Sequence, residues 1–165
     1  MGRFRGVNIH DPIMKEFADN SDNINALAES YDGFIWRLKD ENNNATAFRP
    51  YEDERIAVYM SVWRDIESLE NFAYKSGHVD FLRRKREWLL NFGSAYVVLW
   101  WIPGGTLPTL ENDIVRLDYL NTYGATPFAF TFKNRFAPTE VETPAQYGSC
   151  LKFLFFFPHL YWCVQ

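Results

Sequence analysis

The pattern of hydrophobic and polar positions predicts short strands that alternate with helices. Strands are expected where apolar residues recur at every second position or fill a short run, at residues 4–9, 34–39, 55–63, 94–103 and 128–133. Helices are expected where apolar residues recur every three to four positions, at about residues 12–30, 66–75, 77–91 and 108–124. The predicted order is therefore β-α-β-β-α-α-β-α-β.

Local signals support the ends of two of these helices. Asp11 is a good N-cap residue, and Pro12 suits the first helical position that follows it. Gly124 comes directly after the helix at 108–124, where a glycine C-cap is common.

This order predicts an α+β fold, a ferredoxin-like dimeric α/β barrel with an extra C-terminal tail. The runs at 55–63 and 94–103 are apolar on both faces, whereas helices in such a fold cover only one face of the sheet. A second copy of the sheet would cover the other face. We therefore expect a homodimer whose two sheets enclose a barrel.

The domain is expected to span residues 1–137, followed by a linker and an irregular apolar tail over 138–165. The apolar run of the tail is too short to span a bilayer and includes a lysine and a proline. It is interpreted either as a poorly specified extension or as a segment that touches a membrane or a partner.

Composition limits the classes of protein to which the chain can belong. The chain has 165 residues, 47% hydrophobic and 18% aromatic, which suits one globular domain with a large core or an apolar ligand pocket. A net charge of −4 gives no general attraction for nucleic acid. No secretory signal is visible, so the cytoplasm is expected. The two cysteines and three histidines show no metal-ligand spacing, so no metal is expected: Cys150, Cys163, His10, His78 and His159.

His78 is the strongest candidate for chemistry, because it follows the Ser76-Gly77 break near several aromatic residues. Its imidazole could act as a general acid or base, or it could simply bond to the backbone at a helix start. Asn8 and Tyr59 are expected to be polar groups in the same pocket. Strand alternation places Tyr59 and Trp63 on one face, which we expect to be the barrel interior.

The remaining candidates would line that pocket and contact the substrate: Trp36, Trp63, Arg83, Trp88 and Trp100. Arg83 is the first of four consecutive cationic residues. Such a run is typical of a helix face that is exposed to solvent, and the acidic residues Asp80 and Glu87 would offset part of its charge. Alternatively, one arginine of this run anchors an anionic group at the rim. No phosphate-binding loop or nucleophile motif is present, so nucleotide binding and covalent hydrolysis are not expected.

Three segments together resemble a known family: "SVWRDIESLENFAYKSGHVDFLRRKREW", "LWWIPGGTLPTLENDIVRLDYL" and "TPFAFTF". They resemble a mostly bacterial family of unknown function in the dimeric α/β-barrel superfamily, near the antibiotic-biosynthesis monooxygenases and the stress-responsive A/B-barrel proteins. The similarity runs from about Val7 to Phe136. In the cyclase-like branch, the resemblance assigns His78 to a pocket histidine and Phe72 to a pocket tyrosine, although Phe72 lacks the hydroxyl. In the haem-degrading branch it assigns Asn8, His78 and either Trp63 or Trp88.

Two functions are expected from this combination. The first is a small-molecule enzyme of the monooxygenase-like type without a cofactor, which acts on a hydrophobic or aromatic substrate with His78 as acid/base. The alternative is a non-catalytic protein that binds haem or another flat apolar ligand. A third interpretation is an inner face closed by packing, with a structural role only.

Overall fold

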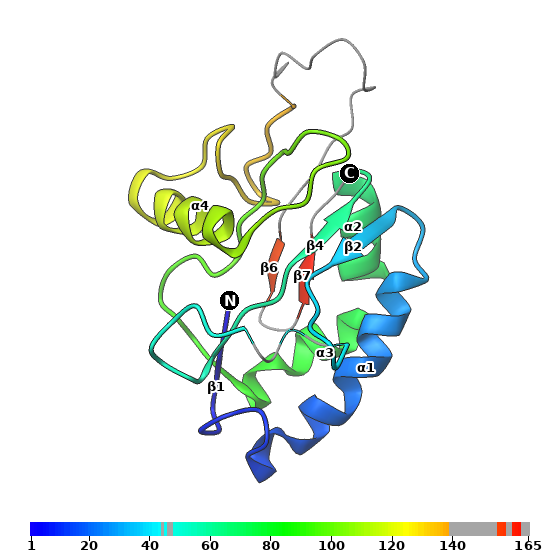
Figure 1. Ribbon diagram of the computed structural model, residues 1–165, viewed down its shortest axis with the longest axis vertical. Helices are drawn as coiled ribbons and strands as arrows, with labels where there is room; N and C mark the ends of the chain where they lie inside the picture. The colour runs from blue at the N-terminus through cyan, green and yellow to red at the C-terminus, as the bar shows by residue number, and fades with distance from the viewer. Residues whose placement is uncertain (44, 46–47, 139–154, 158–159, 163–165) are drawn as a thin grey trace.

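The computed structural model describes residues 1–43, 45, 48–138, 155–157 and 160–162 (Figure 1). The helices are α1 (Lys15–Glu29), α2 (Ile66–Lys75), α3 (His78–Arg84) and α4 (Leu110–Tyr123), with the 3-10 helices η1 (Pro12–Met14) and η2 (Lys85–Glu87). The strands are β1 (Gly2–Phe4), β2 (Phe34–Arg37), β3 (Ile56–Ala57), β4 (Ser61–Trp63), β5 (Leu89–Leu90), β6 (Phe155–Phe157) and β7 (Leu160–Trp162).

The strands form three small antiparallel sheets. In the first, β1 lies between β3 and β5, with Gly2 opposite Ala57 and Arg3 opposite Leu90. In the second, β2 pairs with β4, and the third is the β6–β7 hairpin. The fold is thus α+β, as predicted, and the sheets do not close into a barrel within the described part of the chain.

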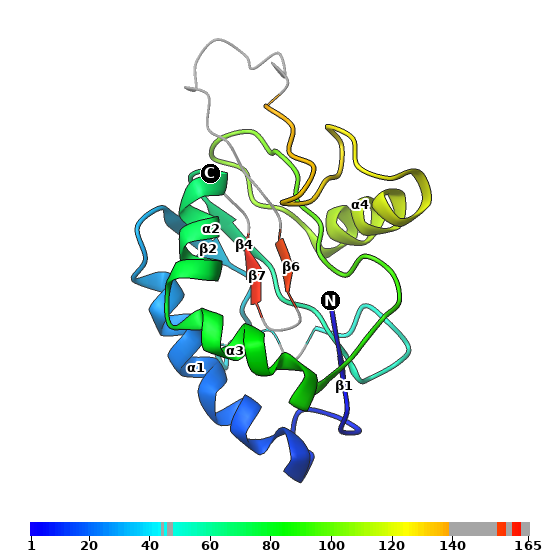
Figure 2. The same ribbon diagram turned by 180° about the vertical axis from the view of Figure 1, so that it is seen from behind.

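Helices lie on two sides of these strands. Both views place α1, α2 and α3 together on one side and α4 on the other, with β4, β6 and β7 between them (Figures 1 and 2). Strand β7 lies next to strand β4. Among the described residues, no helix is long and apolar enough to cross a membrane.

The predicted strand at 55–63 is divided in two, because its halves pair with different partners. Ile56 and Ala57 pair with β1, whereas Ser61–Trp63 pairs with β2. The interruption also changes which side chains share a core. Tyr59 packs in a cluster with Val58 and Val62, while Trp63 belongs to a second cluster with Leu69 and Phe72. The expectation that Tyr59 and Trp63 share one face does not hold.

The first strand is also shorter than predicted. It ends at Phe4, and the following residues turn around the Asp11 carboxylate, which accepts hydrogen bonds from the backbone N–H groups of Val7 (3.0 Å) and Ile13 (3.1 Å). Gly6 allows this turn, because a Cβ there would lie 2.5 Å from the Asp11 side chain. Asn8 is therefore in a bend rather than in a strand.

The last two predicted strands, at 94–103 and 128–133, are reduced to isolated bridges. Leu99 and Phe130 exchange two backbone hydrogen bonds of 2.8 Å, and Thr126 bridges Ala129. Two strands, β6 and β7, lie instead in the tail that was expected to be irregular. The predicted linker, Cys150, Cys163 and His159 lie outside the described residues.

Candidate functional site

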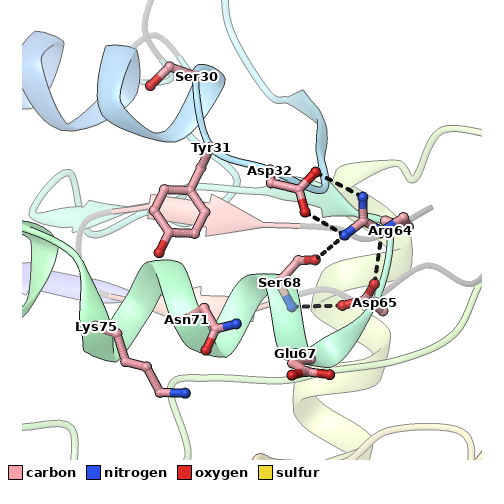
Figure 3. Close-up of a pocket in the computed structure, with 9 residues that line it drawn as sticks. All are labelled: Ser30, Tyr31, Asp32, Arg64, Asp65, Glu67, Ser68, Asn71 and Lys75. Carbon is pink, nitrogen blue, oxygen red and sulfur yellow. Dashed lines mark hydrogen bonds and ion pairs between the residues drawn. The ribbon is translucent and has the colours of Figure 1, made fainter.

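A pocket opens between the end of α1 and the outer face of α2, and we call it the α2 pocket (Figure 3). Its volume is about 770 Å³, within the range of small-molecule sites. It is lined mainly by polar side chains: Ser30, Tyr31, Asp32, Arg64, Asp65, Glu67, Ser68, Asn71 and Lys75.

Arg64 organises one end of this pocket. Its guanidinium donates two hydrogen bonds to the Asp32 carboxylate, at 3.0 and 2.7 Å, and one each to Asp65 (3.0 Å) and the Ser68 hydroxyl (3.1 Å). The hydrogen bonds from Arg64 lower the pKa of Asp32 below its usual value. This end of the pocket is therefore a fixed network in which the charges of Arg64 and its carboxylate partners offset one another.

The Asp32-Gly33 turn brings this network together. Gly33 has a φ of +84°, and a Cβ at this position would lie 2.3 Å from the Ser68 hydroxyl oxygen. Its carbonyl accepts a 2.7 Å hydrogen bond from the backbone N–H of Arg64. Both the left-handed backbone and the close approach to α2 require a glycine here.

The other end is formed by a polar stripe on α2. Ser68, Asn71 and Lys75 recur at three- and four-residue spacing, so they lie along one face of α2, beside the buried Leu69, Phe72 and Ala73; Ser68 is buried as well. The ammonium of Lys75 is exposed and forms no ion pair with any carboxylate of the described residues. Asn71 and Lys75 are thus available to a ligand.

Tyr31 forms the aromatic wall of the pocket. In Figure 3 its hydroxyl points toward the part of α2 that carries Asn71 and Lys75. Its ring meets Trp63 at 6.2 Å and Phe72 at 5.5 Å between centroids, edge-on in both cases. We call Tyr31, Trp63, Phe72 and His78 the aromatic cluster, because these four rings are in successive contact.

His78 lies at the inner end of this cluster and is only 1% exposed. Its ring stacks on Phe72 at 4.9 Å and 24°. Nδ1 is 3.3 Å from the backbone carbonyl oxygen of Ala73, which can only accept, so Nδ1 carries the proton of this hydrogen bond. Burial lowers the pKa of His78 to about 4 against the opposing effect of that bond, so the imidazole is neutral at neutral pH.

The break before His78 orients it. Ser76 ends α2 in an extended conformation, its hydroxyl donates to the Phe72 carbonyl at 2.5 Å, and its oxygen accepts from the His78 N–H at 3.1 Å. Gly77 contributes no special conformation, because its φ is −58° and an added Cβ would make only an ordinary 3.7 Å contact with Leu27. The serine therefore directs His78 inward.

The structure brings three of the predicted site residues together, namely Trp63, Phe72 and His78. Tyr59, Trp88 and Trp100 pack in the first core cluster, and Trp36 is partly buried against it. Asn8 accepts a 2.9 Å hydrogen bond from the His10 N–H in its bend, away from any strand. Arg83 is exposed and pairs with Asp80 at 3.1 Å.

The residues that line the α2 pocket were not among the predicted site residues. The Asp32–Arg64 pair joins residues 32 positions apart, which no local pattern indicates. No cluster of three or more His, Cys, Asp or Glu residues suited to a metal occurs in the described ranges.

Comparison with known proteins gives one match. Residues 3–146 match the model of a family described as a domain of unknown function (DUF3291), and this match covers most of the chain. The chain therefore belongs to this family. No curated protein and no solved structure matches it.

Proposed function

We propose that this member of the DUF3291 family is a small-molecule-binding protein whose ligand occupies the α2 pocket. The observation that carries the proposal is a hollow of about 770 Å³ with one aromatic wall, Tyr31, opposite a polar stripe on a single helix. Ligand sites commonly combine one apolar surface with a few fixed polar groups in this way.

The charges of the pocket indicate the class of ligand. Three carboxylates and two cations line it, a formal net charge of −1, and Arg64 already offsets two of the carboxylates. An anionic ligand gains little there. The pocket fits a flat aromatic molecule with hydroxyl or amine substituents, its ring against Tyr31 and its substituents bonded to Asn71 and Lys75.

His78 has a supporting role in this proposal. Its Nδ1 is bonded to the backbone, and its ring packs behind Phe72, which in turn supports the inner side of Tyr31. The imidazole therefore fixes the position of the aromatic wall and does not need to contact the ligand.

The proposal is tested by calorimetric titration of a dihydroxynaphthalene into the full chain and into Asn71→Ala and Lys75→Gln variants. Each lost hydrogen bond is expected to weaken binding by about three- to tenfold. Lys133→Gln is the matched control, since it removes an exposed charge outside the pocket. If no hydroxylated aromatic binds saturably, or if Asn71→Ala binds as well as the parent, the α2 pocket is not the site.

An enzyme of the monooxygenase-like type, with His78 as acid/base, is the second candidate. The observation in its favour is that a buried, neutral imidazole lies only one ring, Phe72, behind the pocket wall. A neutral imidazole can accept a proton from a substrate hydroxyl. A substrate would have to displace the Tyr31 or Phe72 ring to reach it.

Turnover separates the two candidates. Oxygen uptake and product formation are measured with the same aromatic compounds, in the parent chain and in His78→Gln. Loss of turnover with unchanged affinity would support the enzyme, whereas binding without turnover in the parent supports the binding protein. A titration with haemin tests whether the ligand is haem. A Soret band that forms with the parent chain and is lost in His78→Gln would show that haem is bound through this histidine.

We also propose a homodimer of the ferredoxin-like dimeric α/β-barrel type, as the family resemblance implies. Supporting this, β2 pairs only with β4 among the described strands, and Ile35 on β2 is partly exposed. An unpaired edge of this kind can accept another strand. Light scattering on the purified chain should give twice the 19.4 kDa mass of one chain; a monomer at high concentration would exclude the dimer.

A further inference from the structure

A second hollow, with a different charge, lies where η2, β5 and β1 meet. Its volume is about 430 Å³. Part of its wall is apolar and aromatic, from Leu89, Leu90, Phe92 and Tyr96. It shares no lining residue with the α2 pocket. We call it the cationic pocket.

Three cations, Arg5, Lys85 and Arg86, line this pocket, and no acidic side chain does. Most other described arginines are already paired with carboxylates: Arg3, Arg37, Arg55, Arg64, Arg83, Arg84 and Arg135. Arg5, Lys85 and Arg86 form no ion pair within the described part of the chain. Positive charge is thus concentrated in one concave place without compensation, in a chain whose net charge is −4.

Two of these cations are held in position by the protein itself. The Arg5 Nε donates to the Arg86 carbonyl oxygen at 2.9 Å, which leaves its two terminal nitrogens available for a ligand. The backbone N–H of Arg5 also donates to the Trp88 carbonyl at 2.8 Å. The Lys85 ammonium donates to the Tyr96 hydroxyl at 2.8 Å and lies 5.3 Å from the centre of that ring.

This arrangement reduces the cost of binding an anion. Side chains that are already oriented lose less conformational freedom when a ligand arrives. A guanidinium with two free terminal nitrogens can bind two oxygens of a phosphate or a carboxylate at once. Leu89, Leu90 and Phe92 line the same pocket, and the partly exposed Leu90 and Phe92 offer an apolar surface on which a ring or short chain can pack.

We propose that the cationic pocket binds a small phosphate monoester of an aromatic or short apolar group. Three uncompensated positive charges match a dianionic phosphate better than a single carboxylate. The phosphate oxygens contact Arg5, Lys85 and Arg86, and the organic group lies against Phe92 and the leucines. The site is independent of the α2 pocket and of any role of His78.

Phenyl phosphate, inorganic phosphate and phenol are titrated calorimetrically into the full chain at low ionic strength. Phenyl phosphate is expected to bind more tightly than inorganic phosphate, because only phenyl phosphate uses the apolar wall. Arg86→Gln and Arg5→Gln should each weaken phenyl phosphate binding by about tenfold, the size of one charge-assisted hydrogen bond. Arg86 is exposed, so its variant is expected to fold normally.

Lys133→Gln is the matched control, since it removes one exposed cation that lines neither the cationic pocket nor the α2 pocket. It should leave the affinity for phenyl phosphate unchanged. An equal loss in Lys133→Gln would show general charge attraction and overturn the proposal. So would the absence of saturable binding, or equal affinities for phenyl phosphate and inorganic phosphate.

Discussion

The buried imidazole of His78 predicts a specific loss of stability in mild acid. Its folded pKa is about 4, whereas an exposed histidine titrates near 6.5. As the pH falls through 6.5, the unfolded chain binds a proton that the folded chain does not accept. The stabilising contribution of the neutral form is therefore present above pH 6.5, is lost progressively as the pH falls, and is fully lost below about 4.

The size of this effect follows from the two pKa values. Between about pH 7 and about pH 5, His78 is expected to lower the free energy of unfolding by about 2 kcal/mol. In His78→Gln this position no longer titrates. Any packing defect of the glutamine adds a constant, which changes the stability at each pH but not the difference between the two pH values.

The assay is urea unfolding of the parent, His78→Gln and His10→Gln at both pH values, followed by tryptophan fluorescence. His10→Gln is the control, because it removes an exposed histidine that lies outside the aromatic cluster. Other groups titrate alike in all three proteins and cancel in the comparison. If the parent and His78→Gln lose the same stability in acid, His78 is not held neutral by burial and the geometry assigned to it is wrong.

Three further predictions concern the turn at Gly33, the buried carboxyl of Asp113 and the ring of Phe72. Gly33→Ala should lower the free energy of unfolding by about 1–3 kcal/mol more than Gly105→Ala; both have positive φ, but only at Gly33 would a Cβ meet another side chain. Burial raises the pKa of Asp113 well above its usual value, so the parent should lose stability relative to Asp113→Asn as the pH rises above about 4, measured by thermal unfolding. Phe72→Ala should cost about 3–5 kcal/mol in urea unfolding, because it removes the ring between Tyr31 and His78.

Three of the four helices were predictable because their signals are local, whereas the helix expected at about 77–91 ends at Arg84 and strand β5 (Leu89–Leu90) lies in its last part. Asp65 caps α2 by accepting a 2.7 Å hydrogen bond from the Ser68 N–H, and Thr109 forms a capping box with Asn112 at the start of α4. Gly124 ends α4 with a φ of +80°. Each of these contacts spans only a few residues, so the sequence pattern contains all of the information that it needs.

The strands were less predictable, since pairing depends on distant residues. The run at 55–63 has one continuous apolar pattern, but β1 takes its first part and β2 its last part. The pattern of this run does not indicate where the change of partner occurs. The same limit applies to the strand expected at 94–103, of which only the bridge at Leu99 forms.

The candidate site also contains both local contacts, which could be predicted, and contacts between distant residues, which could not. Phe72 and His78 are six positions apart across one helix break, so their contact could be expected from local structure. The Asp32–Arg64 pair and the contact of Tyr31 with Trp63 depend on how α1 and β4 pack together. The Ser76-Gly77 break and the family resemblance therefore indicated the inner end of the aromatic cluster, but neither indicated the pocket that opens at its outer end.

The observed burial of β4 changes the basis for the proposed dimer. Strands with two apolar faces were expected to need a second copy of the sheet to cover one of them. In the structure, Ser61, Val62 and Trp63 of β4 are all buried within a single chain, with β7 packed beside them. Burial of β4 thus makes no demand for a partner. A dimer, where light scattering finds one, is to be sought at the exposed edge of β2, and Ile35→Lys on that edge should dissociate it without unfolding the chain.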